Sequence, residues 1–396
     1  SLDQNTVYAL SYPSGAFTSL SGDVSYVGTA YTFKTILQDY TMWSWGRASG
    51  GQLGLNGSVN AHKSSPTQIP GTTWGDVGGV KTDGTLWNWG WGGYGQLGQN
   101  SLTNYSSPVQ VPGTTWKFQF QRNSSSFGIK TDGTLWSWGY NDHGRLGLNN
   151  TTKYSSPVQI PGTTWPTSND YQFAQNQYSL SVAAIKTDGT LWTWGAYNEG
   201  SLGQNSNIHY SSPVQIYGGG TTWKCITDHM SNGFAATKTD GTLWAWGKAG
   251  EGILGQNEPG STHRSSPTQI PGTTWDLVTS SGSSLFATKT DGTLWSWGQN
   301  GSHGTLGLSD NTFRSSPVQI GSGTDWSKPF NNTTNAGAAL KTDGTLWIWG
   351  SNAYGSMGNN TYDTGTNSPV QLPGTKWVDL RGDYDYAVRA IQLLEE

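Results

Sequence analysis

The chain has 396 residues, a formal net charge of −4 and only 12% charged side chains, yet it contains 22 tryptophans and 56 glycines. Glycine is far below one residue in three, which excludes collagen, and the 13% aromatic content excludes an intrinsically disordered chain. The absence of a basic run and of long aliphatic runs predicts no nucleic-acid partner and no membrane insertion, and the single cysteine, Cys225, cannot form an intrachain disulfide.

Residues 1–30 precede the regular part of the chain and are treated as a separate segment. They contain one alternating stretch, Asn5–Tyr12, that has the character of a β-strand. We expect this segment to be an N-terminal arm or a closing strand for the domain that follows. An arm would fold onto its own domain or add a strand to a neighbouring molecule through main-chain hydrogen bonds.

From Lys34 onward the chain repeats one pattern of about 50 residues. The tetrapeptide W-x-W-G begins at Trp43, Trp87, Trp136, Trp192, Trp244, Trp295 and Trp347. The hexapeptide K-T-D-G-T-L precedes it from Lys81, Lys130, Lys186, Lys238, Lys289 and Lys341, whereas the segment before Trp43 is degenerate. After W-x-W-G come G-x-L-G (Met357 in the last copy), S-P-[VT]-Q and one more tryptophan, at Trp74, Trp116, Trp165, Trp223, Trp275, Trp326 and Trp377.

Each part of the repeat predicts a strand or a turn. The Asp-Gly pair between alternating segments is a hairpin signal, because glycine accepts the positive φ of a tight turn. In L-W-x-W the two indoles are two residues apart and therefore project from the same face of a strand. S-P-[VT]-Q is typical of an edge strand, where proline is tolerated, and the single tryptophan opens the next strand. One repeat therefore contains four strands.

These repeats predict an all-β fold, a seven-bladed β-propeller over residues 31–391, followed by a tail at 392–396. The stretches Lys376–Leu380 and Tyr386–Ile391 resemble the first two strands of a repeat, so we expect them to complete the blade of Trp43–Trp45. Closing the ring in this way removes a free strand edge. An eight-bladed alternative stays open, because Asn5–Tyr12 aligns with the G-T-L-W-S-W-G-Y strand and would form a mixed N- and C-terminal blade.

The copies of W-G followed by G-x-[LM]-G resemble the regulator of chromosome condensation repeat family, a class of seven-bladed propellers, over Lys34 to Ile391. The resemblance implies a fold more than a function. Founding members of the family exchange nucleotides on a small GTPase and touch chromatin, and bacterial relatives include secreted propellers that inhibit β-lactamases through aromatic loops. The K-T-D-G-T-L-W-x-W-G runs are most similar to those of phage virion and microbial surface proteins.

No nucleophile elbow, phosphate loop or zinc spacing occurs, so we predict a protein that is not an enzyme and has no cofactor. The six histidines are spread over the repeats, which predicts no metal site. The aspartates of K-T-D-G-T are interpreted as turn residues whose carboxylates bond to nearby backbone.

The loops between W-G and G-x-[LM]-G differ from copy to copy, and function usually lies in such loops. Trp91 is the one tryptophan outside the repeated positions. Tyrosine and tryptophan supply large contact areas at low entropic cost. The candidate partner contacts are Trp91, Tyr94, Tyr140, His143, Tyr197 and Tyr354.

We therefore predict a non-enzymatic structural or attachment protein of a virion or cell-surface assembly, located outside the cell, on its surface or in the virion. It would bind protein partners or copies of itself through propeller loops and the N-terminal arm. The alternatives are a secreted propeller that binds or inhibits another protein, and a lectin with a glycan partner.

Overall fold

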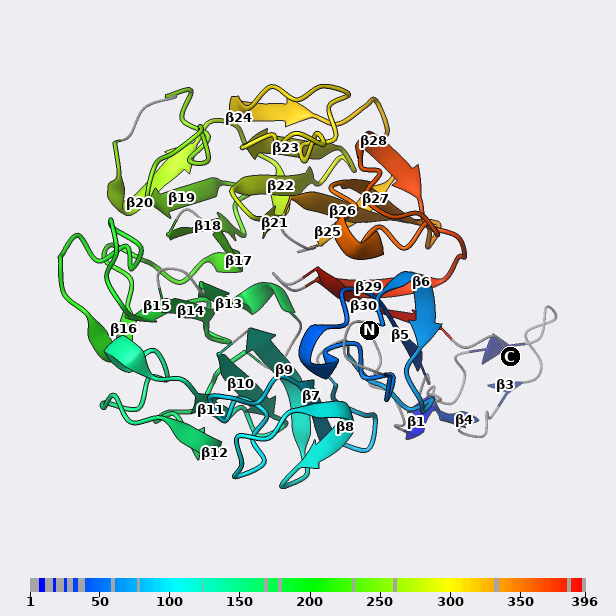
Figure 1. The fold of residues 1–396 in the computed structure, drawn as a ribbon. Coiled ribbons are helices and arrows are strands. Elements are labelled where there is room, and N and C mark those ends of the chain that lie inside the picture. Colours follow the sequence, from blue (N-terminus) through cyan, green and yellow to red (C-terminus); the bar gives the residue numbers. More distant parts are fainter. Residues whose placement is uncertain are drawn as a thin grey trace. The chain divides into compact units, whose positions relative to one another are not determined.

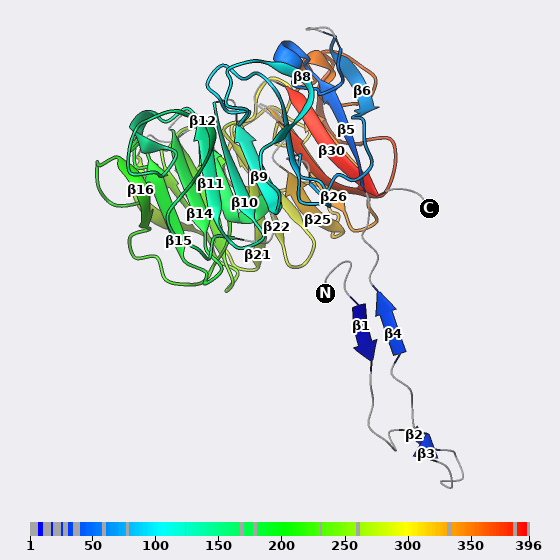
Figure 2. The same cartoon turned by 90° about the horizontal axis from the view of Figure 1, so that it is seen from below.

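The structure is a computed structural model that describes residues 40–393, apart from 58–60, 77–78, 123, 167–169, 177–179, 230–231, 259–261, 331–334 and 383–385, together with four strands within residues 1–39. The chain divides into two compact units, Ser1–Asp39 with Leu394–Glu396, and Tyr40–Leu393. In the first unit, β1 (Val7–Leu10) pairs with β4 (Tyr31–Lys34), and β2 (Phe17–Thr18) pairs with β3 (Ser25–Tyr26), as Figure 2 shows.

The second unit is a ring of antiparallel sheets, six of which have four strands (Figure 1). One sheet consists of β29 (Trp377–Gly382), β30 (Ala387–Leu393), β5 (Tyr40–Gly46) and β6 (Lys63–Gln68). A second consists of β9 (Trp116–Arg122), β10 (Ser125–Lys130), β11 (Leu135–Gly139) and β12 (Tyr154–Gln159). The third consists of β13 (Phe173–Asn176), β14 (Ser181–Ile185), β15 (Leu191–Gly195) and β16 (Tyr210–Gln215). The fourth consists of β17 (Trp223–His229), β18 (Gly233–Lys238), β19 (Leu243–Gly247) and β20 (Arg264–Ile270). The fifth consists of β21 (Trp275–Ser281), β22 (Ser284–Lys289), β23 (Leu294–Gly298) and β24 (Arg314–Gln319). The sixth consists of β25 (Trp326–Phe330), β26 (Ala336–Lys341), β27 (Leu346–Gly350) and β28 (Thr366–Gln371).

In the remaining unit of the ring, the described residues form two strands, β7 (Leu86–Gly90) and β8 (Tyr105–Val111). Before them, the described residues form three isolated bridges, which join Trp74 to Tyr40, Trp74 to Lys81, and Val80 to Leu86. The reason lies in the length of the sequence: residues 75–80 separate Trp74 from Lys81, whereas the longer segment 117–129 separates Trp116 from Lys130 in the next unit. Asp76 Oδ1 accepts the Val80 N–H (2.8 Å) within the shorter segment.

The described strands therefore form a β-propeller with six four-stranded blades, and the prediction of seven blades is wrong. The eight-bladed alternative is wrong as well, because β1, which lies within Asn5–Tyr12, pairs with β4 and not with a C-terminal strand. The all-β propeller fold itself is confirmed. The closing blade is also confirmed, since β30 pairs with β5 in the register Val388 to Trp45 and Ala390 to Trp43.

The second indole of every W-x-W-G links its unit to the preceding one. Its Nε1 donates to a backbone carbonyl of the preceding G-x-[LM]-G segment at 2.8–3.0 Å. The pairs are Trp45 with Ser356, Trp89 with Gln52, Trp138 with Gln96, Trp194 with Arg145, Trp246 with Ser201, Trp297 with Ile253, and Trp349 with Thr305. These indoles are fully buried, so most of the excess of tryptophan serves the packing of the propeller. We call the tryptophans at the repeated positions framework tryptophans.

The K-T-D-G-T turn is the same in all six of its copies. In β10–β11, Asp132 Oδ1 accepts the backbone N–H of Thr134 (2.9 Å) and its hydroxyl (2.7 Å). These two hydrogen bonds hold the pKa of Asp132 below its usual value. Lys130 lies over the rings of Trp116 (4.9 Å) and Trp136 (4.2 Å). The interpretation of the aspartates as turn residues is confirmed.

Helical structure is minor in the described residues. It consists of the 3-10 turns η1 (Ser49–Gly51), η2 (Asp142–Gly144), η3 (Asp170–Gln172) and η4 (Ala353–Gly355). None of the helices in the described part of the chain is long and apolar enough to cross a membrane.

Candidate functional site

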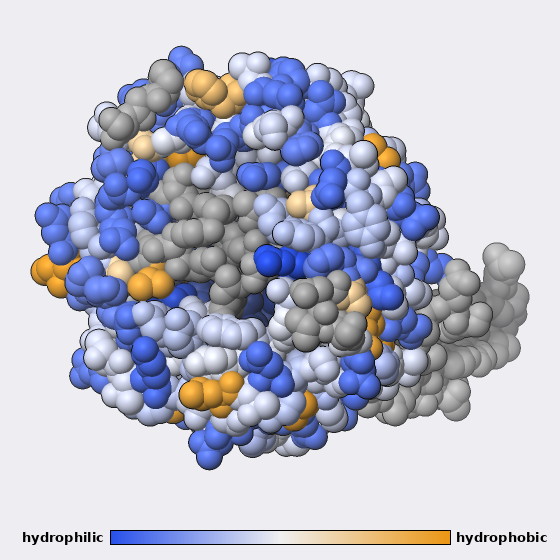
Figure 3. Space-filling model, viewed as in Figure 1, coloured by the Kyte–Doolittle hydropathy of each residue, from blue (hydrophilic) through white to orange (hydrophobic). Residues whose placement is uncertain are grey.

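The third strand of each unit has two ends with different character. It starts at the repeated Asp-Gly turn and ends at W-G. In an antiparallel sheet these two connections therefore lie at opposite ends of the strands, which are the two faces of the ring. We call the end with the W-G loops the loop face and the end with the Asp-Gly turns the turn face. The surface seen in Figure 3 is mostly polar, with apolar side chains in small separate groups.

Three of the predicted contact residues meet on the loop face. The ring centroids of Trp91 and Tyr94 are 5.0 Å apart at an interplanar angle of 88°, and those of Tyr94 and Tyr140 are 4.7 Å apart. Trp91 is 45% exposed and Tyr94 39% exposed, while Tyr140 is half-buried. We call Trp91, Tyr94 and Tyr140 the aromatic loop cluster, which joins the loop after β7 to the loop after β11.

Glycines set the shape of the first of these loops. A Cβ on Gly93 would lie 2.5 Å from the Trp91 ring, so the indole rests against this residue. Gly95 has a φ of +80°, and a Cβ there would lie 2.7 Å from Ser155 Cα on β12. The loop can therefore pack closely on the next blade, which brings Tyr94 to Tyr140.

Charged groups surround Tyr140. Its hydroxyl donates to the Asp142 carboxylate, and this hydrogen bond raises the pKa of Tyr140 above its ordinary value. The Lys153 ammonium lies 4.4 Å from the Tyr140 centroid, 5.6 Å from that of Tyr94 and 4.0 Å from Asp142 Oδ1. The side chain of Lys153 is 50% exposed, so its ammonium stays accessible beside the rings.

A buried arginine belongs to the same loop. Arg145 is fully buried, and burial lowers its pKa to about 10, which leaves it charged at neutral pH. Its Nη1 donates to Ser124 Oγ (3.0 Å). Within the described part of the chain, its Nε and Nη2 have no hydrogen-bond partner. Its charge lies close enough to act on the pKa of Tyr140.

Two further candidates, His143 and Tyr197, are linked through His209. The rings of His143 and His209 are 4.6 Å apart, and His209 Nδ1 accepts the backbone N–H of Tyr197 (2.8 Å). Burial, and then the neighbouring His143, lower the pKa of His209. His143 is exposed and follows Tyr140 in the same loop, whereas Tyr197 is half-buried in the next loop.

Tyr354, the last candidate, has different neighbours. It is 37% exposed, and its ring contacts those of His62 (5.0 Å) and Tyr386 (5.7 Å). The Arg47 guanidinium lies 5.1 Å from its centroid. The six predicted residues thus fall into three groups, of which the aromatic loop cluster is the largest.

Four of the W-G loops are held by the residue that lies three positions before S-P. In each case this side chain accepts a backbone N–H from the second residue after W-G, at 2.8–3.2 Å. The acceptors are His62 for Ala48, Asn104 for Gly92, His209 for Tyr197, and His263 for Ala249. We call these contacts outer-strand latches.

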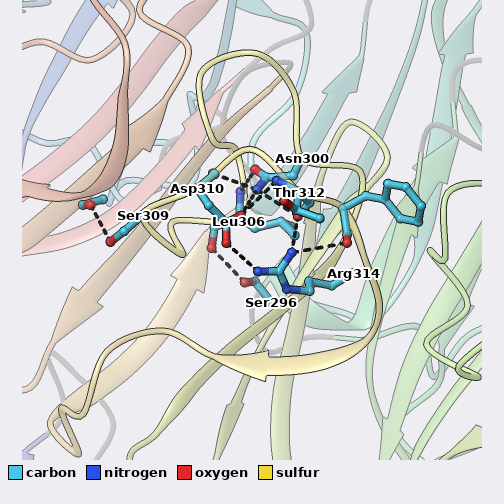
Figure 4. Close-up of polar contacts among 9 residues, drawn as sticks. Ser296, Asn300, Leu306, Ser309, Asp310, Thr312 and Arg314 are labelled. Atoms are coloured by element: carbon cyan, nitrogen blue, oxygen red, sulfur yellow. Dashed lines mark hydrogen bonds and ion pairs between the residues drawn. The ribbon is translucent and has the colours of Figure 1, made fainter.

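The other three loops are held by an asparagine of their own, at the second position after W-G. Asn300 Nδ2 donates to the carbonyls of Asp310 (2.9 Å) and Thr312 (3.1 Å), and its Oδ1 accepts the Leu306 N–H (3.0 Å), as Figure 4 shows. Asn141 and Asn352 make the corresponding contacts. We call these contacts loop latches.

Four residues near the candidate contacts were not predicted from the sequence: Lys153, Asp142, Arg145 and His209. Lys153 occupies the same place before S-S-P as His62, Asn104, His209 and His263. That alignment was available in the sequence. What it did not show is that Asn141 makes the latch in this blade, so that Lys153 does not have the role that the histidines and Asn104 have at the same position.

The described structure also contains a small cavity of about 70 Å³ lined by the inner strands of the ring, among them β9, β13, β17 and β29. Its charged groups are engaged. Arg381 Nη1 donates to the Gln119 carbonyl (2.8 Å), and its guanidinium lies over Phe120 (5.3 Å). We therefore place the candidate site on the loop face.

Comparison with known proteins supports the RCC1 repeat family and an RCC1-like β-propeller fold. The model of the "Regulator of chromosome condensation (RCC1) repeat" matches residues 83–119 and 132–167. The ring superimposes on Prp20p from Saccharomyces cerevisiae with a TM-score of 0.75 and 16% identity, covering 91% of this chain and 93% of that one. Human WBSCR16 gives a TM-score of 0.72 and 17% identity, with 89% and 99% covered.

Curated relatives match about half of the chain. Human E3 ubiquitin-protein ligase HERC2 is 25% identical over 218 residues, which are 51% of this chain and 4% of that protein. The mitochondrial RCC1 domain-containing protein RUG3 of Arabidopsis thaliana is 26% identical over 214 residues, 50% of this chain and 46% of that protein. The chain thus spans less than half the length of these relatives.

These relatives correct the expected location. RUG3 is a mitochondrial protein, and Prp20p is described with binding properties to Gsp1p and histones. An extracellular, cell-surface or virion location does not agree with them, and the prediction of such a location is wrong. The same findings do agree with protein–protein interaction as the general role of RCC1-like propellers.

Proposed function

We propose that this chain is a non-enzymatic protein-binding propeller whose partner is contacted by the aromatic loop cluster. The observation that carries the proposal is the contact chain Trp91–Tyr94–Tyr140 on the loop face, with two members more than a third exposed. Large aromatic side chains held in a fixed arrangement are typical of the few residues that dominate binding energy in protein interfaces.

The contrast with the framework tryptophans supports this assignment. Each framework indole in W-x-W-G is engaged, either with a neighbouring unit or with the threonine of its own turn, as Trp136 is with Thr134 (2.9 Å). Trp91 belongs to neither set, and its ring is turned to the surface beside Gly93. A side chain that the fold does not require is free to serve a partner.

Three of the narrower roles predicted from the sequence are special cases of this proposal: a structural or attachment protein, an inhibitor of another protein, and self-association differ only in which protein occupies the cluster. Glycan binding is the alternative in which a sugar occupies it. The likeness to phage virion and microbial surface proteins rests on the K-T-D-G-T-L-W-x-W-G runs alone, and the proposal does not depend on it.

The test is affinity capture from the source organism with three matched baits: the wild-type chain, Trp91→Ala combined with Tyr140→Ala, and Tyr217→Ala. Tyr217 is 64% exposed and follows β16, at the turn face, so it controls for the loss of an exposed aromatic. We expect the partner to be retained by the wild type and by Tyr217→Ala, and to fall at least about tenfold with the double variant, since one or two hot-spot losses exceed 1.4 kcal/mol. Equal retention by all three baits would reject the proposal.

A further inference from the structure

The aromatic loop cluster has a local charge opposite to that of the whole chain. The chain carries a net charge of −4, but the groups around the cluster are Lys153, Arg145 and Asp142. The carboxylate of Asp142 already accepts the Tyr140 hydroxyl. The groups around the cluster are thus one negative and two positive charges. The side chains of Lys153 and Asp142 are both about half-exposed, and the additional positive charge is that of the buried Arg145.

Lys153 has the geometry of a group that can still bind a ligand. Its ammonium rests on the faces of Tyr140 and Tyr94, which holds a cation near an aromatic surface. Its distance to Asp142, 4.0 Å, lies at the outer limit of an ion pair, and exposed pairs contribute only about 0–1 kcal/mol. Because an ammonium has three donors, it can donate a hydrogen bond to a carboxylate of another molecule while it stays in contact with the two rings.

The buried Arg145 also favours the binding of a carboxylate at the cluster. Its guanidinium is buried, and Nε and Nη2 lack partners among the described residues. A buried charge is screened less by salt than an exposed one, so its field reaches the surface of the cluster. That field disfavours a second cation at Tyr140 and favours an anion.

We infer that the aromatic loop cluster recognises an acidic partner segment, in which an apolar or aromatic side chain packs on Trp91 and Tyr94 and a neighbouring carboxylate pairs with Lys153. This inference rests on the proposed function for its biological meaning and names the chemistry of the partner. Position 153 is available for recognition because the loop latch of Asn141 relieves it of the structural task that His62, Asn104, His209 and His263 perform.

The test uses the whole chain and three probes that share a benzene ring and differ in charge: phenylacetate, benzyl alcohol and phenethylammonium. The readout is the indole N–H resonance of Trp91, identified as the one that disappears in Trp91→Phe. The buried framework indoles, such as Trp138, report whether each variant is folded.

We expect phenylacetate to bind about 2- to 5-fold more tightly than benzyl alcohol, as a single exposed charge pair allows, and phenethylammonium to bind most weakly. Lys153→Met should remove most of the preference for phenylacetate over benzyl alcohol and leave only the part that Arg145 supplies, while the framework resonances stay in place. Raising the salt to about 1 M, where the Debye length is about 3 Å, should weaken the preference of the wild type, because it screens the exposed charge of Lys153.

Three results would overturn the inference: tighter binding of phenethylammonium than of phenylacetate, an unchanged preference in Lys153→Met, or no response of Trp91 to any probe. These results are distinguishable from failure of the proposed function. If capture depends on Trp91 and Tyr140 while the probes show no preference for the anion, the cluster binds protein but not through an acidic group.

Discussion

The seven W-G loops are held in two different ways, and the difference shows where the sequence can change without loss of the fold. In four loops an outer-strand latch, His62, Asn104, His209 or His263, accepts a backbone N–H. In the other three loops, the latch is an asparagine of the loop itself. Where the loop latch is present, the outer-strand position carries Lys153, Phe313 or Gly365, none of which is an acceptor of that kind.

Because either latch holds the loop, the outer-strand position is needed for the fold in some repeats and is open to other roles in the rest. Lys153 is half-exposed beside two tyrosines, and Phe313 is 49% exposed. The turn face shows no such exchange, since its Asp-Gly-Thr contacts recur in every copy of K-T-D-G-T. Variation on this propeller is therefore concentrated at the face where a partner would bind.

The largest effect is expected from removing a loop latch. Asn300→Ala deletes the bonds to the Asp310 and Thr312 carbonyls and to the Leu306 N–H at a buried position. Because buried groups left unpaired cost about 1–3 kcal/mol, we expect the free energy of unfolding in urea to fall by about 2 kcal/mol. A loss below about 0.5 kcal/mol would mean that the latch does not hold the loop.

The next effect tests whether the two latches are interchangeable. Asn141→Ala should destabilise the chain as Asn300→Ala does, and adding Lys153→His should restore about 1 kcal/mol, since an imidazole there can accept the backbone N–H of residue 141. Lys153→His alone is the control and should leave the stability nearly unchanged. If the double variant recovers nothing, the two latches are not equivalent.

A smaller, local effect is expected from pH at the His209 latch. The bond to the Tyr197 N–H requires an unprotonated Nδ1, and burial with the neighbouring His143 lowers the pKa of His209. The folded chain therefore binds fewer protons at this site than the unfolded one, so the stabilisation is complete above a pH of about 6.5 and is lost as the pH falls through the folded pKa. Amide exchange should show Tyr197 losing protection at pH 5, whereas Gly92, held by Asn104, keeps it; equal behaviour of both amides would contradict this.

The smallest effect on stability should come from the candidate contact itself. Trp91→Ala removes a ring that is 45% exposed and lies outside the repeated framework. We expect the free energy of unfolding to change by less than about 0.5 kcal/mol in the same urea experiment. A loss comparable to that of Asn300→Ala would show that Trp91 belongs to the framework.

The repeat made the propeller predictable, because each local signal, the Asp-Gly turn, the alternating indoles and the proline-bearing edge strand, agrees with the same four-stranded unit. The closing blade followed from the strand-like ends. The blade count failed between Trp74 and Lys81, where the motifs on both sides are intact but the segment that separates them is shorter than in the other repeats, and Asp76 accepts the Val80 N–H. Counting motifs cannot detect that, in its described residues, this unit lacks the first two strands of a four-stranded blade.

The candidate site was predictable only in part. Composition pointed to Trp91, Tyr94 and Tyr140, but not to their mutual contact, which depends on how closely Gly95 lets its loop approach Ser155 in the next blade. The charges around the cluster come from residues that are distant in sequence or buried, such as Lys153 and Arg145. Their role follows from the latch that Asn141 provides, and this is a property of the folded loop.

The central claim, that the partner is bound at the aromatic loop cluster, is tested most directly by hydrogen–deuterium exchange of the chain with and without the captured partner. We predict protection in peptides that cover residues 91–99 and 140–153, with unchanged exchange in the Asp-Gly turns around Asp132 and Asp188. Protection confined to the Asp-Gly turns, with the loops after β7 and β11 unaffected, would contradict the account.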